Sequence, residues 1–216
     1  MKLVKSLLAT AVAASTVALS VPAMSYEAGD MMVKAGVIHV MPKDDNLEGR
    51  SSALNADVTV QVEDDTQLGL TFTYMVTPQV GVEVLAATPF KHKIEVNDGA
   101  FKGTTKHLPP TVSAQYYPMD PSSAIQPYVG AGLNMTLFFE EDGIVKNDSL
   151  GSLSDSFGLS VSGGLNYNID EHLMANVAVW YIDIDSKLDK ADAIGLDEDT
   201  VEIDPLVVMA GVGYKF

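Results

Sequence analysis

The chain has 216 residues, of which 47% are hydrophobic, and its formal net charge is −16 at pH 7. An acidic chain repels the phosphate backbone, so the charge excludes nucleic acid as an expected partner. Cysteine is absent, which excludes a scaffold held by disulfides. Beyond the N-terminus no run of about 18 uncharged apolar residues occurs, so no membrane-spanning helix is expected.

The N-terminus has the pattern of a secretory signal peptide. Two lysines precede an uncharged, Ala-rich stretch at 7–19, and the small residues Ala23 and Ser25 follow it. These are the three parts of such a signal. The stretch is shorter than the roughly 20 residues that a spanning helix needs. We therefore predict a signal peptide over 1–25 and a mature chain over 26–216.

Eight later segments alternate between apolar and polar residues. They are residues 31–41, 66–76, 80–94, 105–117, 125–139, 154–168, 172–186 and 201–216. Alternation with a period of two is the pattern of a strand with one apolar face. Eight such strands, joined alternately by short turns and long polar loops, are typical of an outer-membrane barrel. The expected fold class is all-β, an eight-stranded antiparallel transmembrane β-barrel with up-and-down topology.

The connections give the barrel a direction. Short turns and both chain ends are expected on the periplasmic side, because outer-membrane barrels carry their long loops outside. The long connections are rich in Asp and Glu. Extracellular loops are therefore predicted near 42–65, 96–104, 140–153 and 187–200.

Strand parity assigns an inner face with two levels. Lys34, Glu83 and Lys215 point into the periplasmic half of the lumen, and we expect them to pair, because buried charges need partners.

Nearer the outside, parity points five apolar side chains into the lumen, namely Ile38, Leu85, Trp180, Val207 and Met209. These side chains predict a pocket or passage for a small apolar solute. The alternative is that they simply fill the interior, since an eight-stranded barrel is barely wide enough for side chains.

Two prolines, Pro109 and Pro110, fall inside the predicted strand 105–117. Proline cannot donate a ladder hydrogen bond. The pair therefore predicts a local gap between strands, either a lateral opening through the wall or a bulge that only shapes the rim.

The sequence gives little support for the hypothesis of an enzyme or of a metal site. His92 and His107 flank the second long loop, but no Gly-x-Ser-x-Gly or His-Glu-x-x-His run occurs. The acidic loops lack the spacing of a calcium loop, and Asp183-Ile-Asp185 offers too few ligands alone. We expect no catalysis, no metal site and no cofactor. Simple solvation of the acidic loops is favoured over bridging of divalent ions to lipopolysaccharide.

Several runs resemble the outer membrane protein W family. They are residues 67–75, 81–93, 107–110, 127–132 and 179–185, together with the terminal Tyr214-Lys-Phe216. The resemblance implies an eight-stranded outer-membrane barrel with a narrow hydrophobic lumen, linked to passage or binding of small apolar compounds. It also implies that the barrel-assembly machinery recognises Phe216.

The expected function is a narrow channel or binding pocket for small hydrophobic molecules in the outer membrane of a Gram-negative cell. The alternative is a structural or surface-interaction protein with acidic loops and a sealed lumen. The expected partners are outer-membrane lipids, lipopolysaccharide and a small apolar solute, and the expected state is a monomer.

Deletion of Phe216 should lower the amount of barrel in the outer membrane, because this aromatic completes the apolar face of the last strand. Heat-modifiable migration of outer-membrane fractions on gels measures the folded amount. Normal yield of the truncated chain would contradict the role assigned to the terminal residue.

Overall fold

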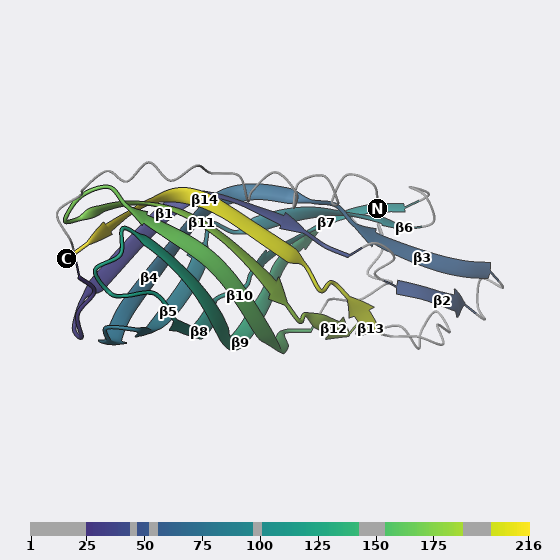
Figure 1. Cartoon of the computed structure of the whole chain (residues 1–216). Coiled ribbons are helices and arrows are strands. Elements are labelled where there is room, and N and C mark those ends of the chain that lie inside the picture. The colour runs from purple at the N-terminus through teal and green to yellow at the C-terminus, as the bar shows by residue number, and fades with distance from the viewer. Residues whose placement is uncertain (1–24, 44–46, 52–55, 97–100, 143–153, 188–199) are drawn as a thin grey trace, which may run out of the picture.

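An antiparallel barrel forms the body of the protein in the computed structural model, which describes residues 25–43, 47–51, 56–96, 101–142, 154–187 and 200–216. Its wall consists of β1 (Met31–Met41), β4 (Asp65–Thr77), β5 (Val80–Ala87), β8 (Thr111–Tyr116), β9 (Ile125–Asp142), β10 (Ser156–Asn168), β11 (Leu173–Ile182) and β14 (Leu206–Lys215). The strand order is β10-β11-β14-β1-β4-β5-β8-β9, and β9 pairs again with β10, so the sheet closes (Figure 1). The predicted eight-stranded barrel is confirmed.

Further strands extend beyond the end of the barrel that lies opposite the C-terminus (Figure 1). They are β2 (Leu47–Ser51), β3 (Ala56–Val62), β6 (Phe90–Val96) and β7 (Phe101–Leu108), with β12 (Asp185–Lys187) and β13 (Thr200–Glu202) as a separate pair. The range 42–65 was expected to be a polar loop, yet it contains β2 and β3. Valines alternate with polar residues along β3, and this β-branched alternation favours a strand.

The other predicted connections differ less from the structure. In the second long loop, predicted near 96–104, Val96 and residues 101–104 are paired in the β6–β7 hairpin, and 97–100 lie outside the described residues. Much of 140–153 and 187–200 lies outside the described residues, as does nearly all of the predicted signal peptide, 1–25.

Four of the predicted strands are interrupted in the structure. Pro89 lies between β5 and β6, directly before the first residue of β6, and Pro109 and Pro110 lie between β7 and β8. Pro205 follows Asp204, whose φ of 35° breaks the extended backbone between β13 and β14. A proline lacks the N–H that a ladder requires. The fourth interruption separates β11 from β12, where no proline occurs.

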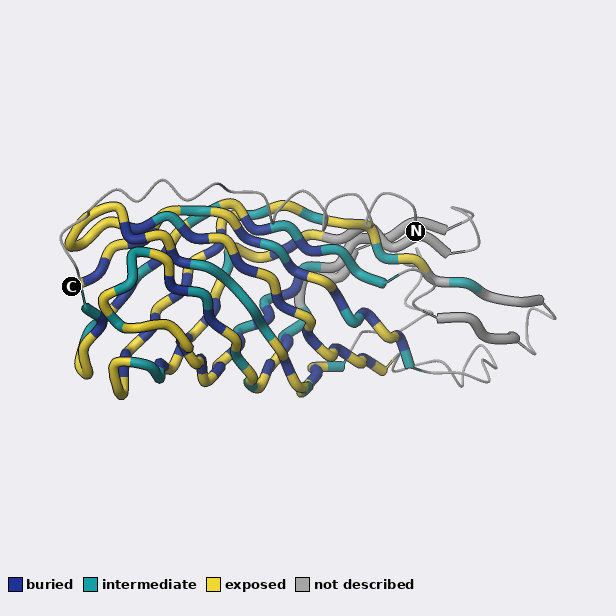
Figure 2. Tube along the Cα trace, viewed as in Figure 1, coloured by how far each residue is buried: buried dark blue, intermediate teal, exposed yellow. Residues whose placement is uncertain are grey.

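Burial alternates residue by residue along the wall, as Figure 2 shows. On β11, buried Asn176 and Trp180 alternate with exposed Val177 and Val179. The outward aromatics close to the short-turn end are Tyr74, Tyr116, Tyr167, Tyr214 and Phe216. An exposed apolar face with an aromatic girdle is what a barrel presents to a bilayer. Within the described ranges, no helix has the length and apolarity needed to cross a membrane.

Substitution of Val177 by Arg should destabilise the barrel by roughly 2–4 kcal/mol, because it places a charge on the lipid face near the bilayer midplane. Leu173→Arg is the matched control, since Leu173 lies on the same face at the start of β11. Near the interface its cost should be about 0–1 kcal/mol. Urea unfolding in lipid vesicles measures both, and equal costs would contradict the assigned depth.

Candidate functional site

Lys34 and Glu83 form an ion pair inside the barrel. The Lys34 Nζ lies 2.8 Å from the Glu83 Oε2, and the two side chains are 0% and 1% exposed. The Thr73 hydroxyl donates to the same carboxylate oxygen at 3.3 Å. The Lys34 Nζ also lies 5.0 Å from the ring centroid of Tyr128 on β9, the strand diametrically opposite β1. The ammonium group therefore reaches across the lumen.

Amides and tyrosines complete this level. The Asn176 Nδ2 donates to the Asn166 Oδ1 at 2.7 Å and to the Tyr128 hydroxyl at 3.2 Å. The rings of Tyr117 and Tyr128 lie 5.2 Å apart. We call the following set the floor: Tyr26, Lys34, Glu83, Tyr117, Tyr128, Asn166 and Asn176. All of its side chains are buried, so it fills the lumen at the end that carries the short turns.

Tyr26 enters the floor from the N-terminal segment and not from a strand. Its hydroxyl accepts from the Asn166 Nδ2 at 3.1 Å and donates to the Asn168 Oδ1 at 3.4 Å. Its ring meets the ring of Tyr117 edge-on at 5.5 Å, and its backbone N–H donates to the Pro121 carbonyl at 3.0 Å. This contact brings the start of the described chain into the mouth of the barrel.

Lys215 pairs with a residue that the sequence did not suggest. Its Nζ donates to the Asp30 Oδ2 at 3.1 Å and to the Ser25 carbonyl at 2.9 Å. We had expected Lys215 to share the Glu83 carboxylate with Lys34. The register explains the difference, because Lys215 pairs with Met32 and so lies nearer the end of the barrel than Lys34.

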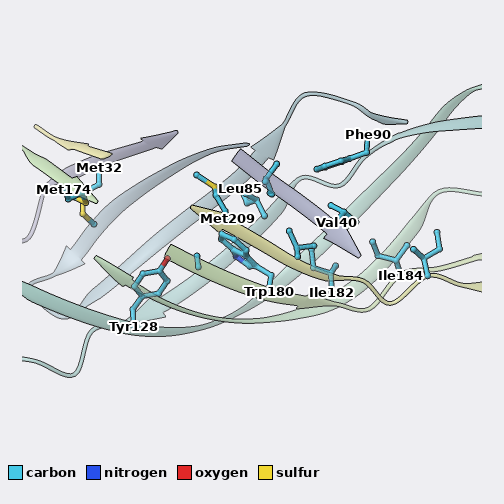
Figure 3. Packing of buried hydrophobic residues seen from close by; sticks show 14 of the residues in the cluster. Met32, Val40, Leu85, Phe90, Tyr128, Met174, Trp180, Ile182, Ile184 and Met209 are labelled. Atoms are coloured by element: carbon cyan, nitrogen blue, oxygen red, sulfur yellow. The ribbon is translucent and has the colours of Figure 1, made fainter. Parts of the chain in front are cut away.

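Above the floor, apolar side chains fill the lumen. We call the following set the apolar layer: Ile38, Leu85, Ile182, Trp180, Val207 and Met209. Their exposed fractions are only 1–3%. Trp180 on β11 and Leu85 on β5 come from opposite walls, with three strands between them in either direction. Figure 3 shows both beside Met209, within one buried cluster. At this level, side chains pack against one another across the whole lumen.

The wall is interrupted beside the apolar layer. The β5–β8 ladder ends at the pair Leu85–Thr111, and the β6–β7 ladder begins at Phe90–His107. Residues 86–89 and 108–110 have no described ladder pair across these strands. We call this region the wall interruption, and it contains Pro109 and Pro110.

Neighbouring strands and aromatic rings hold the wall interruption in place. The Met135 N–H donates to the Pro110 carbonyl at 3.0 Å, so β9 continues past it. On the lumen side the ring of His107 lies 5.4 Å from that of Phe90 and 5.8 Å from that of Phe138. The interruption is thus covered from inside by rings and not by hydrogen-bonded backbone.

Three carboxylates gather where β11 and β14 leave the barrel. Asp183, Asp185 and Asp204 each bring one oxygen within 4.8 Å of the others. Burial, followed by the charges of Asp204 and Asp183, raises the pKa of Asp185. Lys43 lies 3.6 Å from Asp204 and also bonds Glu202, which offsets part of the negative charge. Such oxygens suit a hard cation, but a lysine already supplies a positive charge here.

Sequence reasoning missed Tyr26, Asp30 and Asp204 as members of these clusters. All three lie outside the regular strands, so strand parity could not assign them. Their only sequence signal is position: Tyr26 and Asp30 directly precede β1, and Asp204 directly precedes Pro205.

Comparisons with known proteins point to one family. The OmpW family model matches residues 27–216. Outer membrane protein W of Escherichia coli K12 is 41% identical over 213 residues, which is 97% of this chain and 99% of that protein. Outer membrane protein W of Vibrio cholerae is 40% identical over 206 residues, covering 91% and 93% respectively.

Solved structures agree with the sequence matches. The crystal structure of the outer membrane protein OprG from Pseudomonas aeruginosa superposes with a TM-score of 0.76 at 41% identity, over 90% of this chain and 99% of that one. The solid-state NMR structure of outer membrane protein AlkL in lipid bilayers superposes with a TM-score of 0.68 at 22% identity, over 94% and 97%. At that identity the AlkL match supports the fold alone.

Removing one partner of the buried ion pair should destabilise the barrel more than removing both. Lys34→Met or Glu83→Leu alone leaves an unpaired buried charge, which costs about 3–5 kcal/mol. The double variant replaces the pair with apolar side chains and should lose much less. Urea unfolding of the four proteins in lipid vesicles gives the coupling energy. A double variant as unstable as the sum of the two single variants would show that the charges do not interact.

Proposed function

Because this chain belongs to the OmpW family of outer-membrane barrels, we propose that it binds small hydrophobic molecules in its apolar layer and releases them sideways into the lipid. The family is non-enzymatic, and its members lie in the outer membrane. The protein is therefore an outer-membrane barrel surrounded by lipid. The solute and its route form the proposal.

The wall interruption is the observation that carries the proposal. Leu85 belongs to the apolar layer and also forms the last ladder pair before the interruption. Pro109 is buried on the lumen side, whereas Thr88 and Pro89 are exposed. A molecule held against Leu85 would reach the lipid here by displacing side chains, because no described ladder pair joins residues 86–89 to residues 108–110.

The floor favours a pocket over a channel that runs straight through. Lys34, Glu83 and Tyr128 meet across the lumen, and Tyr26 fills the mouth beneath them. An apolar solute gains nothing by entering such a charged and hydrogen-bonded level. Lateral release lets the solute remain in apolar surroundings on both sides of the wall.

Entry of a solute requires the apolar layer to rearrange, because its side chains are packed. Met209 lies beside Trp180 and Leu85 (Figure 3), and methionine adapts its shape more readily than branched side chains. We propose that Met209, Leu85 and Trp180 shift to make room for the solute.

A second candidate function is a structural or surface-interaction protein with a permanently filled lumen. The near-complete burial of Trp180 and Leu85, at 1% and 3% exposure, favours it. In that case lipopolysaccharide would be the relevant contact of the acidic outer end. Recognition of Phe216 by the assembly machinery and the monomeric state are proposals common to both functions.

A disulfide across the wall interruption should separate the two candidates. The chain has no cysteine, so introduced pairs are the only thiols. Continuing the register from Leu85–Thr111 sets Ala87 opposite Pro109. In lipid vesicles, 1-bromooctane should quench the single tryptophan, Trp180. Oxidised Ala87→Cys/Pro109→Cys should lose most of this quenching, and a reductant should restore it.

The matched control is Ala114→Cys/Ala131→Cys, which joins two exposed residues on the continuous β8–β9 ladder. It should leave the quenching unchanged. If the wild-type Trp180 is not quenched at all, the filled-lumen candidate replaces this proposal. If the locked protein is quenched as fast as the wild type, the solute does not use the wall interruption.

A further inference from the structure

Among the buried polar side-chain atoms that have no partner in the described part of the chain, three lie together on β10 and β11 beside the apolar layer. They are the Trp180 Nε1, the Ser160 Oγ and the Ser162 Oγ. Most buried polar side-chain atoms in proteins are hydrogen-bonded, and each exception needs a physical explanation. Burial without a partner is unfavourable, so three such atoms on adjacent strands call for a common cause.

The three atoms belong to one patch of the inner wall. Ser162 on β10 pairs in register with Trp180 on β11, and Ser160 lies two residues further along the same face. Directly opposite cross-strand pairs have Cβ atoms about 4.5–5.5 Å apart. We call Ser160, Ser162 and Trp180 the donor patch.

On β9, the other neighbour of β10, the residues opposite the two serines are glycines and have no side chain to bond them. In the β9–β10 register, Ser160 pairs with Gly132 and Ser162 with Gly130. A Cβ at position 130 would come within 2.5 Å of the Ser162 Oγ. The glycine therefore leaves the space that this hydroxyl occupies, and no β9 side chain bonds it.

Beyond the two glycines, Ser113 and Gln115 of β8 are the nearest polar side chains, and no described hydrogen bond joins them to the donor patch. The other neighbours are apolar. Trp180 pairs in register with Val207, and Ser160 pairs with Ile182. Across the lumen stands Leu85. A pure alkane in the apolar layer would leave all three polar atoms unsatisfied, as the apolar side chains that fill this layer do.

We infer that the molecule bound in the apolar layer carries one hydrogen-bond acceptor, such as a ketone or ether oxygen, which the donor patch recognises. An indole N–H can only donate, whereas a serine hydroxyl can donate or accept. The inference rests on the proposed function and narrows its solute from small hydrophobic molecules in general to those that carry a single polar atom. Such a site should bind an alkane more weakly than a ketone of the same length, because the alkane leaves the polar atoms of the site unpaired.

The test compares 2-octanone with n-octane. Headspace gas chromatography over lipid nanodiscs with and without the protein gives the excess binding of each volatile solute. Trp180→Phe and Ser160→Ala/Ser162→Ala should each weaken 2-octanone binding by roughly 3–10-fold, which corresponds to the loss of one hydrogen bond. The ratio of 2-octanone binding to n-octane binding should fall in each variant, because both solutes lose the same apolar contact and only the ketone also loses a hydrogen bond. Val161→Ala, on the lipid face between the two serines, is the control and should change neither.

A second readout uses the single tryptophan. Its indole N–H gives one ¹⁵N–¹H resonance, which 2-octanone should shift downfield and n-octane should not. If both solutes bind, but the variants bind 2-octanone as well as the wild type and the resonance stays in place, a water molecule satisfies the donor patch. This outcome overturns the inference and leaves the proposed function standing. If neither solute binds beyond the empty nanodisc, both fail.

Discussion

The closed ladder of backbone hydrogen bonds is the constraint on which the rest of the structure depends. Hydrocarbon offers no partner to a backbone N–H or C=O group, so a spanning sheet must satisfy these groups within itself. The pairing of β9 with β10 achieves this by removing both edges of the sheet. Once the sheet is closed, every second residue faces lipid. The polar residues of the strands must therefore go inside, where eight strands leave little room.

The floor and the apolar layer fill this narrow lumen with different kinds of contact. In the floor, polar groups from opposite walls meet, and Lys34, Glu83 and Asn176 all find partners across strands. In the apolar layer, the walls meet through hydrocarbon, and the Trp180 N–H has no partner in the described part of the chain. The floor is thus held by directional bonds, whereas the layer above it is held by non-directional packing that side chains can leave and re-form. A binding site belongs in the second kind of surroundings.

Local sequence pattern predicted most of the wall, because strand parity is a property of neighbouring residues. It correctly placed Lys34, Glu83, Leu85 and Trp180 on the inner face, where the structure buries them. Their functional roles stay predictions. The pattern failed to predict contacts between residues that are far apart in the chain. The partner of Lys215 comes from the N-terminal segment. Asp204 lies close to Asp183 because β11 ends at Ile182 and its neighbour β14 begins at Leu206, at the same end of the barrel. Strand β3 was missed because its alternation lies in a stretch that charge had marked as a loop.

The ion pair between Lys215 and Asp30 has a consequence for the order of folding. These residues stand 185 positions apart in the chain, and β1 meets β14 along nearly its whole length. Contacts between distant residues form late, since loop closure must precede them. β14 follows every other strand of the wall in the chain, so β1 has no second partner until β14 has been made and exported. A prematurely terminated chain would therefore be an open sheet with a bare edge, and never a smaller barrel. Closure of the barrel therefore depends on the arrival of β14, and no shorter set of these strands can form the same closed wall.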